Sequence, residues 1–136
     1  MSPHVSPFSS FFSYFDLFGF GSKTGIDLNG ESEGIIFNLD KVGDLELATS
    51  AFGQGISVTP IQQVVAVSSV VNGGILLKPY IVKNVSESST GSIIIENKTT
   101  KIRNTISKET SDIMKYALES VVAKGGGHYA YIDGYR

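Results

Sequence analysis

Residues 45–74, LELATSAFGQGISVTPIQQVVAVSSVVNGG, decide the fold of this chain, because their second half is the clearest helix in the sequence. Thr59 is suited to cap this helix, Pro60 to occupy its first position, and Gln62 completes a capping-box pattern. Residues 72–74, Asn-Gly-Gly, end it. Side chains then repeat at helical spacing along it, at Ile61, Val64, Val65, Ser68 and Val71. Valine is a mediocre helix former, so we predict a helix that packing holds on both sides within a larger fold.

Upstream of this stretch, the pattern predicts two further helices and two irregular segments. Residues 1–8 are rich in proline and lack periodicity, which is typical of a disordered or foreign leader. Residues 9–18 predict an aromatic helix capped by Ser9 or Ser10, and residues 19–30 a glycine-rich loop. Residues 31–42 favour an irregular surface segment. Residues 44–51 predict a short helix, with inward-facing Leu45, Leu47 and Ala48.

Downstream, the sequence predicts a hairpin and a final helix. Residues 80–85 and 92–96 are β-branched runs that flank a polar turn-forming linker, and residues 101–106 favour a third extended piece. Ser107 is suited to cap a helix that ends at Lys124 before three glycines. Its apolar stripe is formed by Ile113, Met114, Ala117, Leu118, Val121 and Val122.

Composition limits the possible functions. A chain of 136 residues is long enough for one domain, and its net charge of −2, with acids and bases mixed, does not indicate a nucleic-acid or membrane-surface partner. The chain has no cysteine, which excludes disulfides and thiolate metal sites. No apolar run approaches the ~20 residues of a membrane span, and we identify no targeting signal.

Residues 21–24, Gly-Ser-Lys-Thr, invite comparison with a phosphate-binding loop. The spacing fails, because serine stands where glycine should precede the lysine, and the loop follows a predicted helix, not a strand. A nucleotide-binding protein is therefore a distant alternative.

Three blocks of sequence together resemble class B penicillin-binding proteins, most closely their sporulation-type members. The first is FGQG (52–55), VTPIQ (58–62) and NGG (72–74), which resembles a block inside the transpeptidase domain of that family. The second, GFGSKTGIDLNGE (19–31), resembles the segment before it, and the third, GYR (134–136), resembles the approach to the last catalytic strand. The resemblance implies an α+β fold for residues 9–136: a partial penicillin-binding transpeptidase domain of the serine β-lactamase-like type, with helices and a β-hairpin, between the second and third catalytic motifs.

The resemblance also says which chemistry to look for. The family's D,D-transpeptidases cross-link peptidoglycan through a serine that is activated by a lysine three positions later. In this sequence no serine has lysine at that spacing, and no serine has asparagine two positions on. Ser111 and Ser120 have lysine at the fourth position, which we interpret as solvated helix-face contacts. The Lys-Thr-Gly at residues 23–25 resembles the family's loop, not its active-site strand.

We therefore predict no catalytic, cofactor-binding or metal-binding residue in this chain, and no cofactor. His4 lies in the predicted leader and His128 in a glycine-rich loop, where an ordinary loop histidine is the simpler interpretation. The sequence predicts a transpeptidase fragment that is inactive by itself. The alternative is a non-catalytic binding or assembly module derived from such a domain.

By resemblance, the partners of the whole family are the peptidoglycan stem peptide and β-lactams, at the extracytoplasmic face of the cell membrane. For this chain we expect self-association or loose packing. The reason is that residues 11–18 and 113–122 would expose apolar faces that a complete domain covers.

Overall fold

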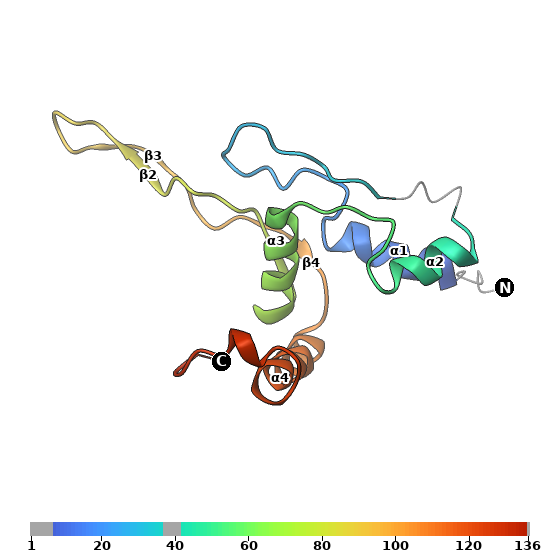
Figure 1. The fold of residues 1–136 in the computed structure, drawn as a ribbon. Coiled ribbons are helices and arrows are strands. Elements are labelled where there is room, and N and C mark those ends of the chain that lie inside the picture. Colours follow the sequence, from blue (N-terminus) through green and yellow to red (C-terminus); the bar gives the residue numbers. More distant parts are fainter. Residues whose placement is uncertain (1–6, 37–41, 136) are drawn as a thin grey trace.

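The computed structural model describes residues 7–36 and 42–135, and its fold is α+β, as predicted. Figure 1 shows helix α3 near the middle of the molecule, with α1 and α2 to one side, α4 below, and a hairpin projecting away on the other side. The helices are α1 (Pro7–Leu17), α2 (Asp44–Ser50), α3 (Pro60–Val71), α4 (Lys108–Lys124) and the short 3-10 helix η2 (His128–Ala130). The strands are β1 (Ile75–Leu77), β2 (Asn84–Ser86), β3 (Ile93–Glu96) and β4 (Lys101–Asn104).

Both ends of α3 are formed as the sequence predicts. The Gln62 backbone N–H donates to Thr59 Oγ1 at 3.3 Å, and the Thr59 N–H donates to Gln62 Oε1 at 2.9 Å, which completes the capping box. At the other end, the Asn72 side chain bonds both backbone groups of Ile75, and the Gly74 N–H donates to the Ser69 carbonyl at 2.9 Å. The helix is therefore closed by local hydrogen bonds at each end.

The prediction that packing covers α3 on both sides is wrong. The buried residues of this helix are Gln62, Ala66 and Ser69, whereas Val64 is 60 % and Val71 40 % exposed. Gln62 is buried against the glycine-rich loop, whose Ser22 and Glu33 carbonyls it bonds, and Ser69 lies beside Thr105, while β1 and α4 both contact this helix. The valines of the opposite side have no such cover among the described residues.

Hydroxyl groups join α3 to the segments beside it. Ser111 of α4 is fully buried; its Oγ donates to the Val70 carbonyl at 2.5 Å and accepts the Gly73 N–H at 3.1 Å. Thr105, also buried, donates to Ser69 Oγ at 3.3 Å. These bonds satisfy polar groups that would otherwise be costly to bury, and they hold the start of α4 against the end of α3.

The strands form two separate antiparallel pairs. Strand β1 pairs with β4, with Leu76 opposite Arg103, and Leu76 is 3 % exposed. The predicted extended piece at residues 101–106 is thus confirmed as β4, but its partner β1 was missed. The three-residue run from Ile75 is too short for a periodicity signal.

The predicted hairpin is confirmed as β2 paired with β3, with Val85 opposite Ile95. Its first strand is shorter than predicted, beginning at Asn84. The reason is a competing acceptor: the Asp27 carboxylate takes the Ile81 and Val82 N–H groups at 2.8 and 2.9 Å. These two amides hold the hairpin base to the glycine-rich loop.

The N-terminal helices differ from their predicted details. Helix α1 begins at Pro7, so neither Ser9 nor Ser10 starts it, and most of the predicted leader lies outside the described residues. In α2 the inward-facing set is wrong, because Leu45 is 71 % exposed and Ala48 is exposed, while Leu47 is half-buried.

Helix α1 is held by ring contacts within the helix and by a side chain from β4. Phe12 is 3 % exposed and its ring lies 5.6 Å from that of Phe15. Arg103 donates to the Leu17 carbonyl at 2.9 Å and to the Asp16 carbonyl at 2.5 Å, so a cation from β4 caps the negative end of α1.

Candidate functional site

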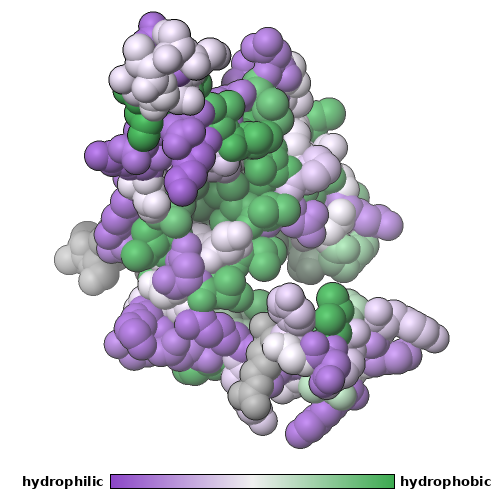
Figure 2. Space-filling model, turned by 90° about the vertical axis from the view of Figure 1, so that its left-hand side faces the viewer, coloured by the Kyte–Doolittle hydropathy of each residue, from purple (hydrophilic) through white to green (hydrophobic). Residues whose placement is uncertain are grey.

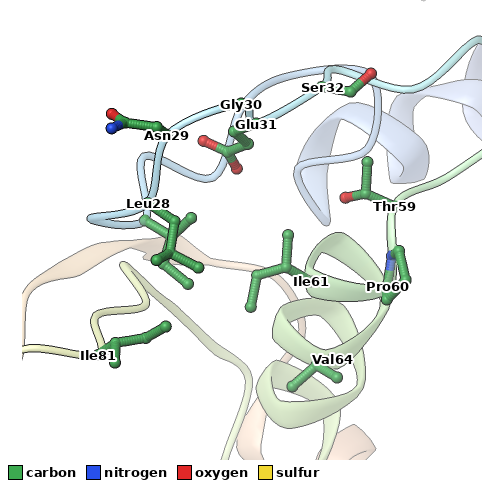
Figure 3. Close-up of a pocket in the computed structure, with 11 residues that line it drawn as sticks. Leu28, Asn29, Gly30, Glu31, Ser32, Thr59, Pro60, Ile61, Val64 and Ile81 are labelled. Atoms are coloured by element: carbon green, nitrogen blue, oxygen red, sulfur yellow. The ribbon is translucent and has the colours of Figure 1, made fainter.

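An open, mainly apolar groove of about 530 Å³ lies between the glycine-rich loop and the first half of α3. Figure 3 shows Leu28 on the loop and Ile61 on α3 facing this space, with Ile81 of the hairpin base beside them. The groove is lined by Ile26, Leu28, Asn29, Gly30, Glu31, Ser32, Thr59, Pro60, Ile61, Val64 and Ile81. No lysine is among these residues, so the groove offers mainly apolar contact and places no lysine beside its one serine.

The Glu31 carboxylate accepts hydrogen bonds from the loop at residues 23–25. Glu31 accepts the Thr24 backbone N–H at 2.6 Å, the Thr24 hydroxyl at 2.5 Å and the Gly25 N–H at 3.1 Å. The bond from the Thr24 hydroxyl, followed by the two backbone bonds and the nearby Lys23 charge, holds the Glu31 pKa below its ordinary value. The loop amides that a phosphate would need are therefore already taken.

The Lys-Thr-Gly at residues 23–25 was predicted to belong to a loop and not to an active-site strand. The residues lie in an irregular loop after α1, as predicted, and not on a strand. Lys23 is exposed there. The prediction that this lysine belongs to a loop and not to a strand is confirmed.

Gln62 ties the loop to α3. Its side-chain nitrogen donates to the Ser22 carbonyl at 2.7 Å and to the Glu33 carbonyl at 2.9 Å, while its oxygen accepts the Thr59 N–H. The side chain is 1 % exposed. The capping-box pattern in the sequence predicted the bond between Gln62 and Thr59. It gave no sign of the bonds from Gln62 to the two loop carbonyls.

Ser111 and Ser120 of α4, which each have a lysine four positions on, both donate their hydroxyls to backbone carbonyls. Lys115 is bonded to Asp112 at 3.2 Å, and Ser120 donates to the Tyr116 carbonyl at 2.8 Å. The interpretation of Ser111 as solvated is wrong, since its hydroxyl is buried between α3 and α4. Sequence spacing alone could not show this, because the partner residues lie about forty positions away.

His128 begins the short helix η2, and its ring lies tilted against that of the neighbouring Tyr129, with the ring centres 4.0 Å apart. In the part of the chain that the structure describes, no three His, Asp or Glu side chains gather as a metal site would require. Across residues 7–36 and 42–135, none of the helices is of the length and apolarity that a bilayer span demands. His4 lies outside the described residues.

Comparison with known sequences identifies the class of protein. The family model described as penicillin binding protein transpeptidase domain matches residues 6–136. The chain is 54 % identical over 125 residues to stage V sporulation protein D of Bacillus subtilis, covering 92 % of this chain and 19 % of that protein. It is 29 % identical over 131 residues to peptidoglycan D,D-transpeptidase FtsI of Escherichia coli, covering 96 % of this chain and 20 % of that protein.

Solved structures agree. Penicillin-binding protein 3 of Mycobacterium tuberculosis, complexed with ampicillin, superposes with a TM-score of 0.84 at 28 % identity, covering 97 % of this chain and 30 % of that one. Its aztreonam complex gives a TM-score of 0.83. The fold and the sequence therefore define a transpeptidase-type protein. The chain belongs to the penicillin-binding protein transpeptidase family, and it spans about a fifth of the length of the curated relatives named here.

Proposed function

We propose that this chain is the part of a penicillin-binding D,D-transpeptidase domain that builds the scaffold around the active site, in an enzyme that cross-links peptidoglycan. The observation that carries the proposal is the family match over residues 6–136. The 54 % identity to a sporulation protein supports a role in spore or cell-wall synthesis. Residues 9–136 would then form one partial domain.

The proposal extends to partners and location. In the whole protein, the acceptor and donor would be peptidoglycan stem peptides, and β-lactams would bind at the same site. The aztreonam and ampicillin complexes of a relative support the second point. Such an enzyme would act at the extracytoplasmic face of the cell membrane.

We further propose that the 136-residue chain alone carries out no acyl transfer. Acyl-enzyme formation needs a serine whose proton a positioned base removes, with amides that hold the developing oxyanion. Of the serine hydroxyls described above, Ser111 and Ser120 are bonded to backbone carbonyls, and neither is bonded to the lysine that follows it.

Labelling with a fluorescent penicillin tests both parts of the proposal. For the chain alone, we expect no stoichiometric adduct on a denaturing gel or by intact-protein mass spectrometry. For a chimera in which residues 6–136 replace the matching segment of stage V sporulation protein D, we expect labelling as in the unmodified protein. The unmodified protein is the positive control.

Two results would contradict the proposal. A single adduct on the isolated chain, lost when the labelled serine becomes alanine, would show that this polypeptide has its own acylation chemistry. A chimera that is folded by circular dichroism yet unlabelled would show that the segment is not a working transpeptidase scaffold.

A further inference from the structure

Strand β3 is apolar on both faces and exposed on both. Ile93, Ile94 and Ile95 are 58 %, 64 % and 54 % exposed. Successive side chains of a strand point to opposite faces, so a half-buried strand normally alternates apolar and polar residues. Three consecutive isoleucines in an exposed hairpin depart from this rule and mark a surface that gains from being covered.

The hairpin of β2 and β3 stands clear of the remaining elements. Figure 1 shows it extending away from α3, and every residue of its two strands is exposed. Its base is held firmly: Asn97 donates from its side chain to the Val82 carbonyl at 2.7 Å and from its backbone to the Lys83 carbonyl at 2.8 Å. The hairpin is therefore an arm with a fixed origin and an uncovered apolar end.

One edge of β3 is free. Strand β3 pairs with β2 on one side, and no other strand of the described residues pairs with it. Exposed edges in natural proteins usually carry lysine, proline or inward charges that block further pairing. The run from Ile93 to Ile95 has none of these residues, and the nearest charges are Glu96 and Lys98 beyond its end, which pair with each other at 3.5 Å.

The sequence of β3 matches itself in one antiparallel register. A two-fold axis at Ile94 places Ile94 opposite its own copy and each Ile93 opposite an Ile95, so all six isoleucines face isoleucine. Glu96 then lies opposite the uncharged Ser92, and no like charges are opposed. Moving the axis to Ile95 would place Ile94 opposite the Glu96 carboxylate, and moving it to Ile93 would leave a single isoleucine pair.

We propose that β3 pairs edge to edge with β3 of a second copy of this chain, antiparallel, about a two-fold axis at Ile94. Pairing satisfies the free edge and covers apolar surface at the same time. The inference does not depend on the proposed function, because no residue of β2 or β3 is among those that line the groove.

Cysteine cross-linking tests the register directly, because the chain has no native cysteine. Opposite residues of antiparallel strands have Cα atoms about 4.5–5.5 Å apart, which a disulfide can bridge, whereas diagonal neighbours lie about 7–8 Å apart. We expect Ile94→Cys to form a covalent dimer under mild oxidation. Ile93→Cys and Ile95→Cys should each form no covalent dimer alone, and should cross-link to each other when mixed.

Sedimentation velocity tests the association without cross-linking. Ile94→Lys places two like charges opposite each other, so we expect the dimer dissociation constant to rise roughly tenfold or more. The matched control is Ile113→Lys on exposed α4, which should leave the dimer intact. Circular dichroism should be unchanged for both variants, because Ile94 and Ile113 are 64 % and 69 % exposed.

Three outcomes would overturn the proposal. The first is a wild-type chain that sediments as a monomer at every concentration. The second is equal cross-linking by all three single cysteine variants. The third is dissociation by Ile113→Lys but not by Ile94→Lys, which would place the contact on α4.

Discussion

Gln62 shows at the residue scale how one buried side chain connects parts of the chain that lie far apart in sequence. It closes the start of α3 and also bonds the carbonyls of Ser22 and Glu33, forty and twenty-nine positions upstream. The position needs a side chain of this size that can both donate and accept hydrogen bonds. The side-chain oxygen of Gln62 accepts the Thr59 N–H, and its nitrogen donates to the two loop carbonyls. Loop position and helix start are thereby coupled.

We expect Gln62→Met to lower the free energy of unfolding by about 2–4 kcal/mol, because it keeps the side-chain volume but leaves three backbone groups without their partner. Urea unfolding followed by circular dichroism measures the change. The matched control is Gln63→Met at the next, exposed position, which should change stability by less than about 0.5 kcal/mol. Equal effects at the two positions would show that the loop contacts of Gln62 do not contribute.

At the scale of elements, the turn from α3 into β1 depends on two glycines with different surroundings. Both have positive φ angles, +97° for Gly73 and +87° for Gly74. A Cβ on Gly74 would lie 2.0 Å from the Ile106 carbonyl oxygen, whereas nothing lies within 4 Å of a Cβ on Gly73. The Gly74 carbonyl also accepts the Thr105 N–H at 2.7 Å, so the α3–β1 turn is pressed against the segment that leads into α4.

This difference predicts unequal effects of the same substitution. Gly73→Ala should cost about 1–2 kcal/mol, which is the cost of left-handed backbone for a residue with a Cβ. Gly74→Ala should cost clearly more, because the backbone around Ile106 must also move. Thermal melts of the two variants measure the difference, and a Gly74→Ala variant as stable as Gly73→Ala would show that this packing is loose.

For the whole molecule, the main feature is the small amount of apolar surface that is fully buried. Only Phe12, Ala66 and Leu76 form the buried apolar core of the described residues. Figure 2 shows hydrophobic side chains in a continuous band on one face. The stripe predicted on α4 is exposed, with Ile113 at 69 % and Val121 at 52 %. Self-association of this chain stays a prediction, and these surfaces are the reason for it.

The exposure of α3 leads to a test of which side of the helix is covered. Val64→Asp should change the free energy of unfolding by less than about 0.5 kcal/mol, because Val64 is 60 % exposed. Ala66→Asp should cost about 3 kcal/mol or more, because Ala66 is 5 % exposed and the carboxylate would be buried without a partner. Circular-dichroism melts compare the two variants. Unfolding by Val64→Asp would mean that the outer face of α3 is covered, by another copy or another protein.

The sequence by itself determined the features that depend on local chemistry. The caps of α3 and α4, the glycine end of α3, the existence of the hairpin and the placement of residues 23–25 in a loop were all predictable. Each follows from hydrogen bonds and backbone angles of residues within a few positions of one another. The resemblance that defines the family also lies in such short blocks, at residues 19–31 and 52–62.

Only the tertiary structure decided what depends on distant neighbours. Helix α3 is apolar on most of its circumference, so periodicity could not show that Gln62, Ala66 and Ser69 would face inward. The partner of β4, the burial of Ser111 and the late start of the first hairpin strand at Asn84 were likewise hidden from the sequence. In each case the deciding group comes from another element: β1, α3 or the Asp27 carboxylate. Contacts between residues so far apart in the sequence leave no periodic pattern in it, because their energy depends on how the intervening chain has folded.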